Sequence, residues 1–237
     1  MTSIHIQSSD NQGEFTAYVA HPETDQTAPA IIVIQEIFGV NAVMRNICDH
    51  LAQNGYIAVC PDLFWRQEPG IDITDQTQAE WDKAFALFNG FDVDKGIDDL
   101  IATLNHTRTL QGCNGRVGNI GFCLGGKMSY LMSTRSDTDC SVSYYGVGIE
   151  GMLSEADTIT KPFLMHIASE DQFVPKEAQD KIHQGLEHNT HITRHVYEGC
   201  DHAFARHGGE HYDEGAARLA NMRTSDFLAT HLGQDTA

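Results

Sequence analysis

The chain has 237 residues, of which 41% are hydrophobic and 20% charged, enough to bury the core of one ordinary globular domain. Its 33 acidic residues outnumber the 15 basic ones and give a formal net charge of −18. A surface this acidic repels phosphate backbones and anionic lipid headgroups, which argues against nucleic acid or a membrane as a partner.

The first ten residues contain neither a basic stretch nor an apolar stretch typical of a secretory signal. The longest apolar run, residues 28–34, is too short to cross a bilayer. None of the six cysteines forms a C-x-x-C pair. These features predict reduced thiols and a cytoplasmic location.

Short β-branched runs alternate with amphipathic helical patterns, which predicts an α/β fold with a mainly parallel, doubly wound sheet and helices on both faces. The opening segment, with Phe15, Tyr18 and Ala20, is typical of an antiparallel hairpin strand at the sheet edge. Strands are predicted at residues 30–35, 56–60, 117–122, 140–145, 162–168 and 191–197, and the first two are expected to be buried. Helices are predicted at about 41–54, 76–89 and 94–107, and from about 124, 175 and 213. Without a linker or repeat, residues 1–237 are expected to form a single domain.

The helix predicted at 41–54 has a clear apolar spacing. Val43, Ile47 and Leu51 recur every four residues, which predicts the buried face of this helix. Asn41 is expected to cap its N-terminus and Gly55 to end it.

The central chemical signal is Gly121-Phe-Cys123-Leu-Gly125, between an apolar strand and the start of a helix. It has the form of the nucleophile elbow G-x-S-x-G, with cysteine in place of serine. Glycines two residues to either side let the strand and the helix pass closely around a strained turn. The positive N-terminus of the following helix would favour a thiolate. The alternative is a buried structural cysteine beside ordinary turn glycines.

In this type of fold the nucleophile, the acid and the histidine follow successive strands in that chain order. Asp171 follows the strand predicted at 162–168, and His202 lies in the loop after the strand at 191–197. The histidine would take the thiol proton while the aspartate fixes its tautomer. Glu170 is the close competitor for the acid role, and Asp201 is poorly placed to orient the ring of its neighbour.

The segment Gln35-Glu36-Ile37-Phe38-Gly39 follows the strand predicted at 30–35. The loop at this place supplies one N–H of an oxyanion hole and the residue after the nucleophile supplies the other, which nominates Ile37 and Leu124. A carboxylate at Glu36 would keep a nearby thiol protonated or accept a hydrogen bond from it. The alternative is that Glu36 is a solvated loop charge.

Six segments spread along the chain resemble motifs of the dienelactone hydrolase family of α/β-hydrolases, the carboxymethylenebutenolidases. They are QEIFG (35–39), PDLFWR (61–66), IGFCLGG (120–126), SYYG (143–146), EDQFVP (170–175) and DHAFAR (201–206). The resemblance implies a catalytic triad of Cys123, Asp171 and His202, and hydrolysis of an ester or lactone through a thioester.

The same resemblance implies roles for further residues. Glu36 would hold the resting thiol and release it when substrate arrives. Arg206 would bind the substrate carboxylate. The aromatic residues implied to contact the substrate are Phe38, Tyr144, Tyr145 and Phe173.

One departure from the family pattern concerns the helix predicted at 76–89. The family's dienelactone enzymes carry a second arginine there, and in this chain Trp81 occupies that position. Phe85 and Phe88 follow on the same helical face and add apolar surface. This predicts that neutral, flat or aromatic esters and lactones are accepted at least as well as an anionic dienelactone.

Other functions fit the sequence less well. The histidines at 202, 207 and 211 are interrupted by glycines, and those at 188, 191 and 195 straddle a loop and a strand, so neither a metal nor a cofactor is expected. A thioesterase acting on acyl-CoA would need a basic patch, which the sequence lacks. A non-catalytic or redox-sensing thiol protein and a broad-specificity carboxylesterase remain as alternatives. The expected partner is a small ester or lactone, and the chain is expected to be a monomer or a small homo-oligomer.

Overall fold

Strands and helices alternate along the chain in the computed structural model, which describes residues 2–233. The chain divides into two units, residues 1–118 and 119–237. The expectation of a single domain over residues 1–237 stays a prediction. No helix within residues 2–233 combines the length and apolar character that crossing a bilayer requires.

The first unit is built on four strands, β1 (Thr2–Gln7), β2 (Glu14–Ala20), β3 (Ala28–Ile34) and β4 (Ile57–Pro61). The hairpin of β1 and β2 is antiparallel, as predicted, and β2 also runs antiparallel to β4. β3 and β4 are parallel, with Ile31 opposite Ala58. Every residue of β3 and β4 is buried, which explains their continuous apolar runs.

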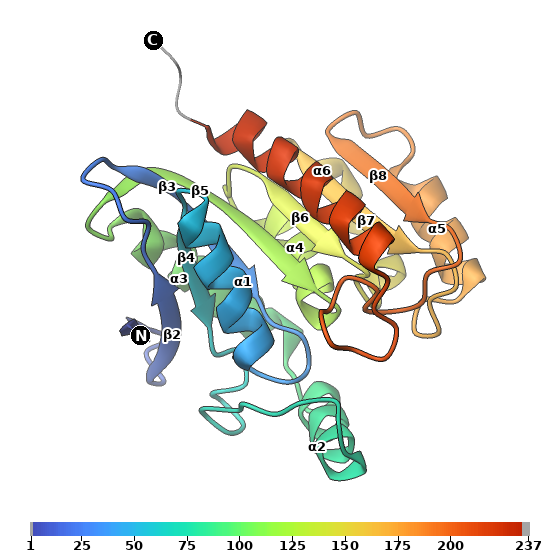
Figure 1. The fold of residues 1–237 in the computed structure, drawn as a ribbon, viewed down its shortest axis with the longest axis horizontal. Helices are drawn as coiled ribbons and strands as arrows, with labels where there is room; N and C mark the ends of the chain where they lie inside the picture. Colours follow the sequence, from blue (N-terminus) through green and yellow to red (C-terminus); the bar gives the residue numbers. More distant parts are fainter. Residues whose placement is uncertain (1, 234–237) are drawn as a thin grey trace. The chain divides into compact units, whose positions relative to one another are not determined.

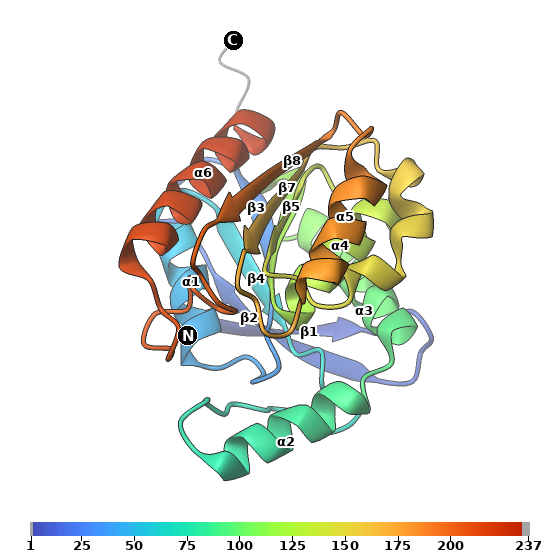
Figure 2. The same cartoon turned by 90° about the vertical axis from the view of Figure 1, so that its right-hand side faces the viewer.

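Three helices belong to this unit, α1 (Ala42–Gln53), α2 (Gln78–Asn89) and α3 (Val93–Arg108). α1 and α3 cover opposite faces of the strands, and α2 stands apart from them (Figure 2). The three helices agree with the predicted ranges to within two residues. Helices on both faces of the strands agree with the predicted architecture, although two of the three strand pairings given for this unit are antiparallel.

The ends of α1 are as predicted, but its buried face is not. The Asn41 side chain accepts a hydrogen bond from the backbone N–H of Met44 at 3.2 Å, and Gly55 has a positive φ of 90° just after the helix. The prediction of a buried face at Val43, Ile47 and Leu51 was wrong, because these side chains are only half-buried. The buried residues are Met44, Cys48 and Ala52. The smaller side chains of Cys48 and Ala52 allow the helix to pack closely on the strands.

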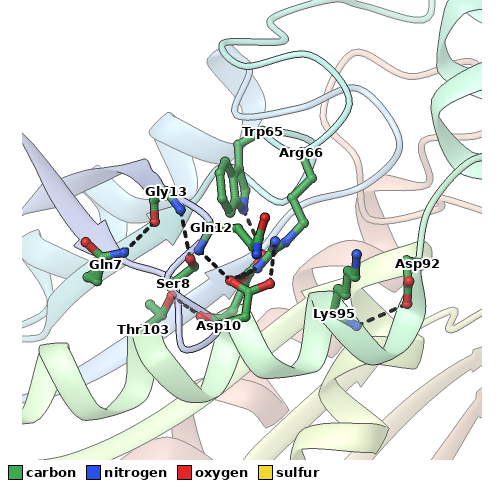
Figure 3. A network of polar contacts seen from close by, with 11 residues as sticks. Gln7, Ser8, Asp10, Gln12, Gly13, Trp65, Arg66, Asp92, Lys95 and Thr103 are labelled. Atoms are coloured by element: carbon green, nitrogen blue, oxygen red, sulfur yellow. Dashed lines mark hydrogen bonds and ion pairs between the residues drawn. The ribbon is translucent and has the colours of Figure 1, made fainter.

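A charged network joins the first hairpin, the segment after β4 and helix α3. Both oxygens of the buried Asp99 carboxylate accept hydrogen bonds from Arg66, at 2.8 and 2.9 Å, and Trp65 Nε1 donates to the same carboxylate at 2.8 Å. Arg66 also forms a bidentate ion pair with Asp10. Figure 3 shows Arg66 extending toward Asp10 beside α3, with Trp65 next to Arg66. The motif PDLFWR therefore includes two residues that hold this unit together.

The second unit contains the last four residues of β5 (Cys113–Phe122) together with β6 (Ser141–Tyr144), β7 (Phe163–Ala168) and β8 (Ile192–Tyr197). All neighbouring pairs in the order β5-β6-β7-β8 are parallel. α6 (Glu214–Leu232) crosses one face, and α4 (Leu124–Arg135) and α5 (Lys176–Leu186) cover the other (Figure 1, Figure 2). The sequence did not predict two short 3-10 helices, η1 (Ile149–Gly151) and η2 (Leu153–Thr158).

Under α6 lies a buried network of neutral polar groups. His166 pairs with the Tyr197 hydroxyl through Nδ1 at 2.8 Å and with the Thr224 hydroxyl through Nε2 at 2.9 Å. The Tyr144 hydroxyl lies 2.7 Å from Thr224 Oγ1 and donates to Asn221 at 3.0 Å. Burial lowers the pKa of His166 to about 3, so its imidazole stays neutral at physiological pH.

Candidate active site

Cys123 occupies the sharp turn between β5 and α4. Its backbone angles, φ 57° and ψ −114°, define a conformation that residues with a side chain rarely adopt. The turn is held by hydrogen bonds from Cys123 N–H to the Tyr144 carbonyl at 3.1 Å and from Gly126 N–H to the Cys123 carbonyl at 3.0 Å. Such strain persists only where the surrounding structure enforces it, and it is common at functional sites.

Two glycines near the turn have a steric role, which was predicted for Gly121 and not for Gly126, while the role predicted for Gly125 stays a prediction. A Cβ at Gly121 would overlap the carbonyl group of Gly125. A Cβ at Gly126 would lie 2.7 Å from the Cα atom of Gly146. The strand and the helix therefore approach so closely at this turn that no larger side chain fits.

The position of Cys123 also places its thiol at the N-terminus of α4. Leu124 is the first residue of that helix, so its N–H is among the amides that have no partner inside the helix. The first turn of α4 contains no acidic residue. The partial positive charge there favours a thiolate and other negative groups.

Asp171 and His202 are in direct contact. The Nδ1 atom of His202 lies 2.9 and 3.0 Å from the two carboxylate oxygens of Asp171, and both side chains are buried. Asp171 Oδ1 also accepts the backbone N–H groups of Phe173 and Val174, at 2.9 and 3.1 Å. The carboxylate is thus fixed from two sides, and its contact assigns the Nδ1 proton of His202.

His202 is poised to hold a proton. Burial lowers its pKa, but the neighbouring Cys123 sulfur and the Asp171 carboxylate outweigh burial and raise the pKa to about 10. Its Nε2 atom is buried and has no hydrogen bond of ordinary geometry within residues 2–233. The ring therefore has one nitrogen bound to the acid and one available for proton transfer.

Glu170, the competitor for the acid role, is oriented differently. It is exposed, and its carboxylate accepts a hydrogen bond from Ser169 Oγ at 3.2 Å. Its backbone N–H donates to the carbonyl of Cys200 at 2.9 Å. His202 makes its carboxylate contact with Asp171 instead.

Two aromatic side chains lie against the His202 ring. Tyr145 approaches it with ring centroids 5.1 Å apart, and Phe173 does so at 4.9 Å, both nearly edge-on. Tyr145 has a positive φ of 39°, a second strained residue near the histidine. Both rings were predicted to contact substrate, and the structure adds that both restrict the imidazole.

Tyr144 has a different environment from its neighbour. It is 1% exposed, and its hydroxyl is engaged by Thr224 and Asn221. Its ring packs on Phe122 and on His166. These contacts favour a role in the core beneath α6 over the predicted contact with substrate, because the hydroxyl is already bound.

Arg206, the predicted anchor for a substrate carboxylate, is a buried arginine. Only 9% of the residue is exposed. Its backbone is held by bonds to Ala203 and Gly209, and a Cβ at Gly209 would lie 2.9 Å from Arg206 Nε. A buried guanidinium keeps its positive charge in an otherwise acidic protein. Its role toward substrate stays a prediction.

The segment predicted to supply the oxyanion hole follows β3 in the first unit. Glu36, Ile37 and Phe38 are all buried, so the alternative of a solvated Glu36 was wrong. The buried side chain of Gln35 accepts the N–H of Leu63 at 3.1 Å and donates to the Glu36 carbonyl at 3.3 Å. The backbone of this segment is therefore fixed by neighbours that the sequence did not reveal.

Trp81 belongs to an aromatic cluster in the first unit. Its ring stacks on Phe85, with centroids 5.5 Å apart, and meets Phe38 edge-on at 5.1 Å. Its Nε1 donates to the Asp75 carbonyl at 2.9 Å. The predicted shared face of Trp81 and Phe85 is confirmed, and Phe38 joins it from another segment.

The histidines considered as metal ligands do not gather into a site. Within residues 2–233, no group of three His, Cys, Asp or Glu side chains is arranged to hold a metal ion. His211 lies 3.7 Å from Asp201, and the ring of His207 packs on Tyr212. None of the six cysteines, all within the described residues, forms a disulfide.

A cysteine at a strained strand-to-helix turn, followed by an acid and a histidine after successive parallel strands, defines an α/β-hydrolase. The fold comparison agrees. A crystal structure of a candidate dienelactone hydrolase from Klebsiella pneumoniae matches with a TM-score of 0.80 at 26% identity, covering 99% of this chain and 100% of that one.

The family follows from sequence comparison. The model of the dienelactone hydrolase family matches residues 15–232. A protein from Azospirillum brasilense, named as a candidate carboxymethylenebutenolidase, is 51% identical over 243 residues, covering 98% of this chain and all of the relative. The carboxymethylenebutenolidase of Pseudomonas putida is 41% identical over 226 residues, covering 95% of each chain. The chain belongs to the dienelactone hydrolase family and is a hydrolase that acts on ester or lactone bonds.

Proposed function

We propose that this hydrolase uses Cys123 as its nucleophile, His202 as general base and acid, and Asp171 as the group that orients the histidine. His202 Nε2 takes the thiol proton, and the thiolate attacks the acyl carbon. Collapse of the oxyanion expels the alkoxide, which receives that proton. Water then attacks the thioester with His202 as base, and this releases the acid and restores the thiol.

The observation that carries this proposal is the contact between the buried Asp171 carboxylate and the His202 ring. Asp171 binds Nδ1 at 2.9 Å, and the Cys123 sulfur raises the pKa of the same ring. A redox-sensing thiol would need only the cysteine and its helix N-terminus. The buried acid and histidine favour catalysis over that alternative, because they are costly to bury without a task.

The remaining roles rest on the sequence. The N–H groups of Leu124 and Ile37 are proposed as oxyanion donors, and Glu36 as the carboxylate that controls the resting thiol. Arg206 is proposed to bind a carboxylate of the substrate. Tyr145 and Phe173 are proposed to contact the substrate as well as the histidine.

The substrate is proposed to be a small, flat or aromatic ester or lactone. Phe38, Trp81 and Phe85 supply packed aromatic surface where the family pattern has an arginine. The relative from Pseudomonas putida is named a carboxymethylenebutenolidase. A cytoplasmic location is proposed because none of the six cysteines forms a disulfide.

The test replaces Cys123 by alanine and follows hydrolysis of an aryl acetate and of dienelactone. We expect loss of turnover by at least about 10⁴-fold, with an unchanged melting temperature. Cys113→Ala is the matched control and should behave like the parent. Mass spectrometry of the quenched parent should find an acyl group on Cys123. Near-parental turnover by Cys123→Ala would overturn the proposal.

A further inference from the structure

The loops that carry Asp171 and His202 run side by side beyond the ends of their strands. We call residues 169–175 the acid loop and residues 198–213 the histidine loop. Ser169 N–H donates to the Tyr197 carbonyl at 3.1 Å, and Gly199 N–H donates to Ser169 Oγ at 2.9 Å. Glu170 N–H donates to the Cys200 carbonyl at 2.9 Å. The pairing of β7 with β8 therefore continues for two more residues.

After Cys200 the next link between the two loops is a side chain. Asp201 Oδ1 accepts the backbone N–H of Gln172 at 3.0 Å and the backbone N–H of His202 at 2.6 Å. Asp201 Oδ2 faces the Gln172 amide at 3.4 Å and His211 at 3.7 Å. One carboxylate oxygen thus joins the residue after the acid to the histidine itself.

From this geometry we infer that Asp201 is a positioning residue for the acid–histidine pair, and this inference rests on the proposed function. Asp171 lies between Glu170 and Gln172, and each of these is tied to the histidine loop. The Asp201 carboxylate fixes the separation of the two loops at the point where Asp171 and His202 face each other. The hydrogen bonds that tie it to Gln172 and His202 include the backbone N–H of each residue, so it positions the pair through the backbone.

The charge of Asp201 suits this task. Burial would raise its pKa, but the N–H groups of Gln172 and His202 outweigh burial and lower it. The carboxylate is therefore ionised at neutral pH, and hydrogen bonds to an ionised acceptor are stronger than those to a neutral one. The sequence analysis gave Asp201 no role because a residue adjacent to His202 is poorly placed to orient its ring. The hydrogen bonds from Asp201 to the backbones of Gln172 and His202 could not be predicted from the sequence.

A positioning role predicts a specific kinetic pattern. Small displacements of catalytic groups lower the rate of the chemical step by about tenfold to a hundredfold without weakening substrate binding. We expect Asp201→Ala to lower kcat by this amount while KM stays within about twofold. Asp201→Asn keeps an acceptor oxygen at the same place and should recover kcat to within about threefold of the parent. Asp201→Glu keeps the charge but moves the oxygens by one methylene, and should resemble Asp201→Ala.

The experiment measures kcat and KM for phenyl acetate, normalised to the fraction of molecules alkylated at Cys123. Asp180→Ala, which removes an exposed carboxylate on α5, is the matched control and should match the parent. If Asp201→Ala does not fold, the comparison of Asp201→Glu with Asp201→Asn decides. Parental kcat in Asp201→Glu, or no recovery in Asp201→Asn, would overturn the positioning role.

Cys123→Ala is assayed in parallel to separate the two proposals. Turnover by Cys123→Ala would refute the proposed function itself. An inactive Cys123→Ala together with fully active Asp201 variants would leave the proposed function intact and refute only the role of Asp201.

Discussion

The two units each contain a buried carboxylate with several donors, and they use it differently. In the first unit Asp99 is bound by Trp65 and by two nitrogens of Arg66, a partner that stays charged at any ordinary pH. In the second unit Asp171 is bound by two backbone amides and by His202, whose other nitrogen has no ordinary hydrogen bond within the described residues. Removing one partner of a buried carboxylate–cation pair destabilises the fold, whereas a carboxylate paired with a titratable ring can support proton transfer.

The same substitution at both carboxylates tests whether Asp171 serves catalysis and Asp99 serves stability. The larger effect is expected for Asp171→Asn. We expect kcat to fall by about 10³- to 10⁴-fold, because an amide does not fix the required tautomer of His202. The melting temperature should change little, since size and packing are kept. Steady-state kinetics and thermal unfolding check both expectations. Glu170→Gln is the matched control, and loss of turnover there instead of in Asp171→Asn would show that the acid is misassigned.

Asp99→Asn should have the opposite signature. It leaves Arg66 and Trp65 facing an amide that accepts through one oxygen only, so we expect a loss of about 3 kcal/mol in the free energy of unfolding. The loss lies at the low end for a buried pair because Arg66 keeps its contact with Asp10. Denaturant unfolding measures it. The kcat of the folded fraction should stay parental, and a large drop in kcat would contradict the division of roles.

Much of the fold and the candidate site was predictable because both depend on local patterns. Strand and helix positions follow from apolar periodicity, and Cys123, Asp171 and His202 were singled out by their places after strands. The buried face of α1 was not predictable, because apolar residues line two adjacent faces and only contact with the strands selects one.

Contacts between residues that are far apart in the chain could not be predicted from the sequence. The pairing of Arg66 with Asp99 spans 33 positions, and the contact of Asp201 with Gln172 depends on how two loops run together. From the sequence, Tyr144 and Tyr145 had the same predicted role. Tyr144 is the last residue of β6 and Tyr145 follows it, and successive side chains along a strand point to opposite faces. Side-chain contacts between residues far apart in sequence can be identified only from the folded structure.

His166 offers a smaller test, on the response of the second unit to acid. The unfolded chain takes up a proton near the ordinary histidine pKa of 6.5, whereas burial lowers the folded pKa to about 3. Between these values the unfolded state binds more protons, so stability falls as pH decreases. At pH 5 we expect about 2 kcal/mol less stability from this group. Urea unfolding from pH 7 to pH 4 should show a shallower loss in His166→Gln than in the parent, while the exposed control His5→Gln should follow the parent.

The smallest expected effect concerns substrate preference. The aromatic cluster of the first unit is proposed to favour uncharged substrates, and the buried arginine of the second unit is proposed to favour anionic ones. Trp81 is held by Phe38, by Phe85 and by its bond to Asp75, so it presents a fixed apolar ring. Arg206 is proposed as the contact for an anionic substrate, and one charge-assisted hydrogen bond contributes roughly 1.5–3 kcal/mol.

We therefore expect the parent to hydrolyse an uncharged aryl acetate at least as well as dienelactone. Arg206→Ala should lower kcat/KM for dienelactone by about tenfold or more and leave the aryl acetate within about threefold, because only the anionic substrate loses a partner. Trp81→Arg should shift the preference toward dienelactone by about tenfold. Gln78→Ala is the control on the same helix, since this side chain is exposed and uncharged. A parent that strongly prefers dienelactone, with a preference that neither substitution changes, would show that these two residues do not set specificity.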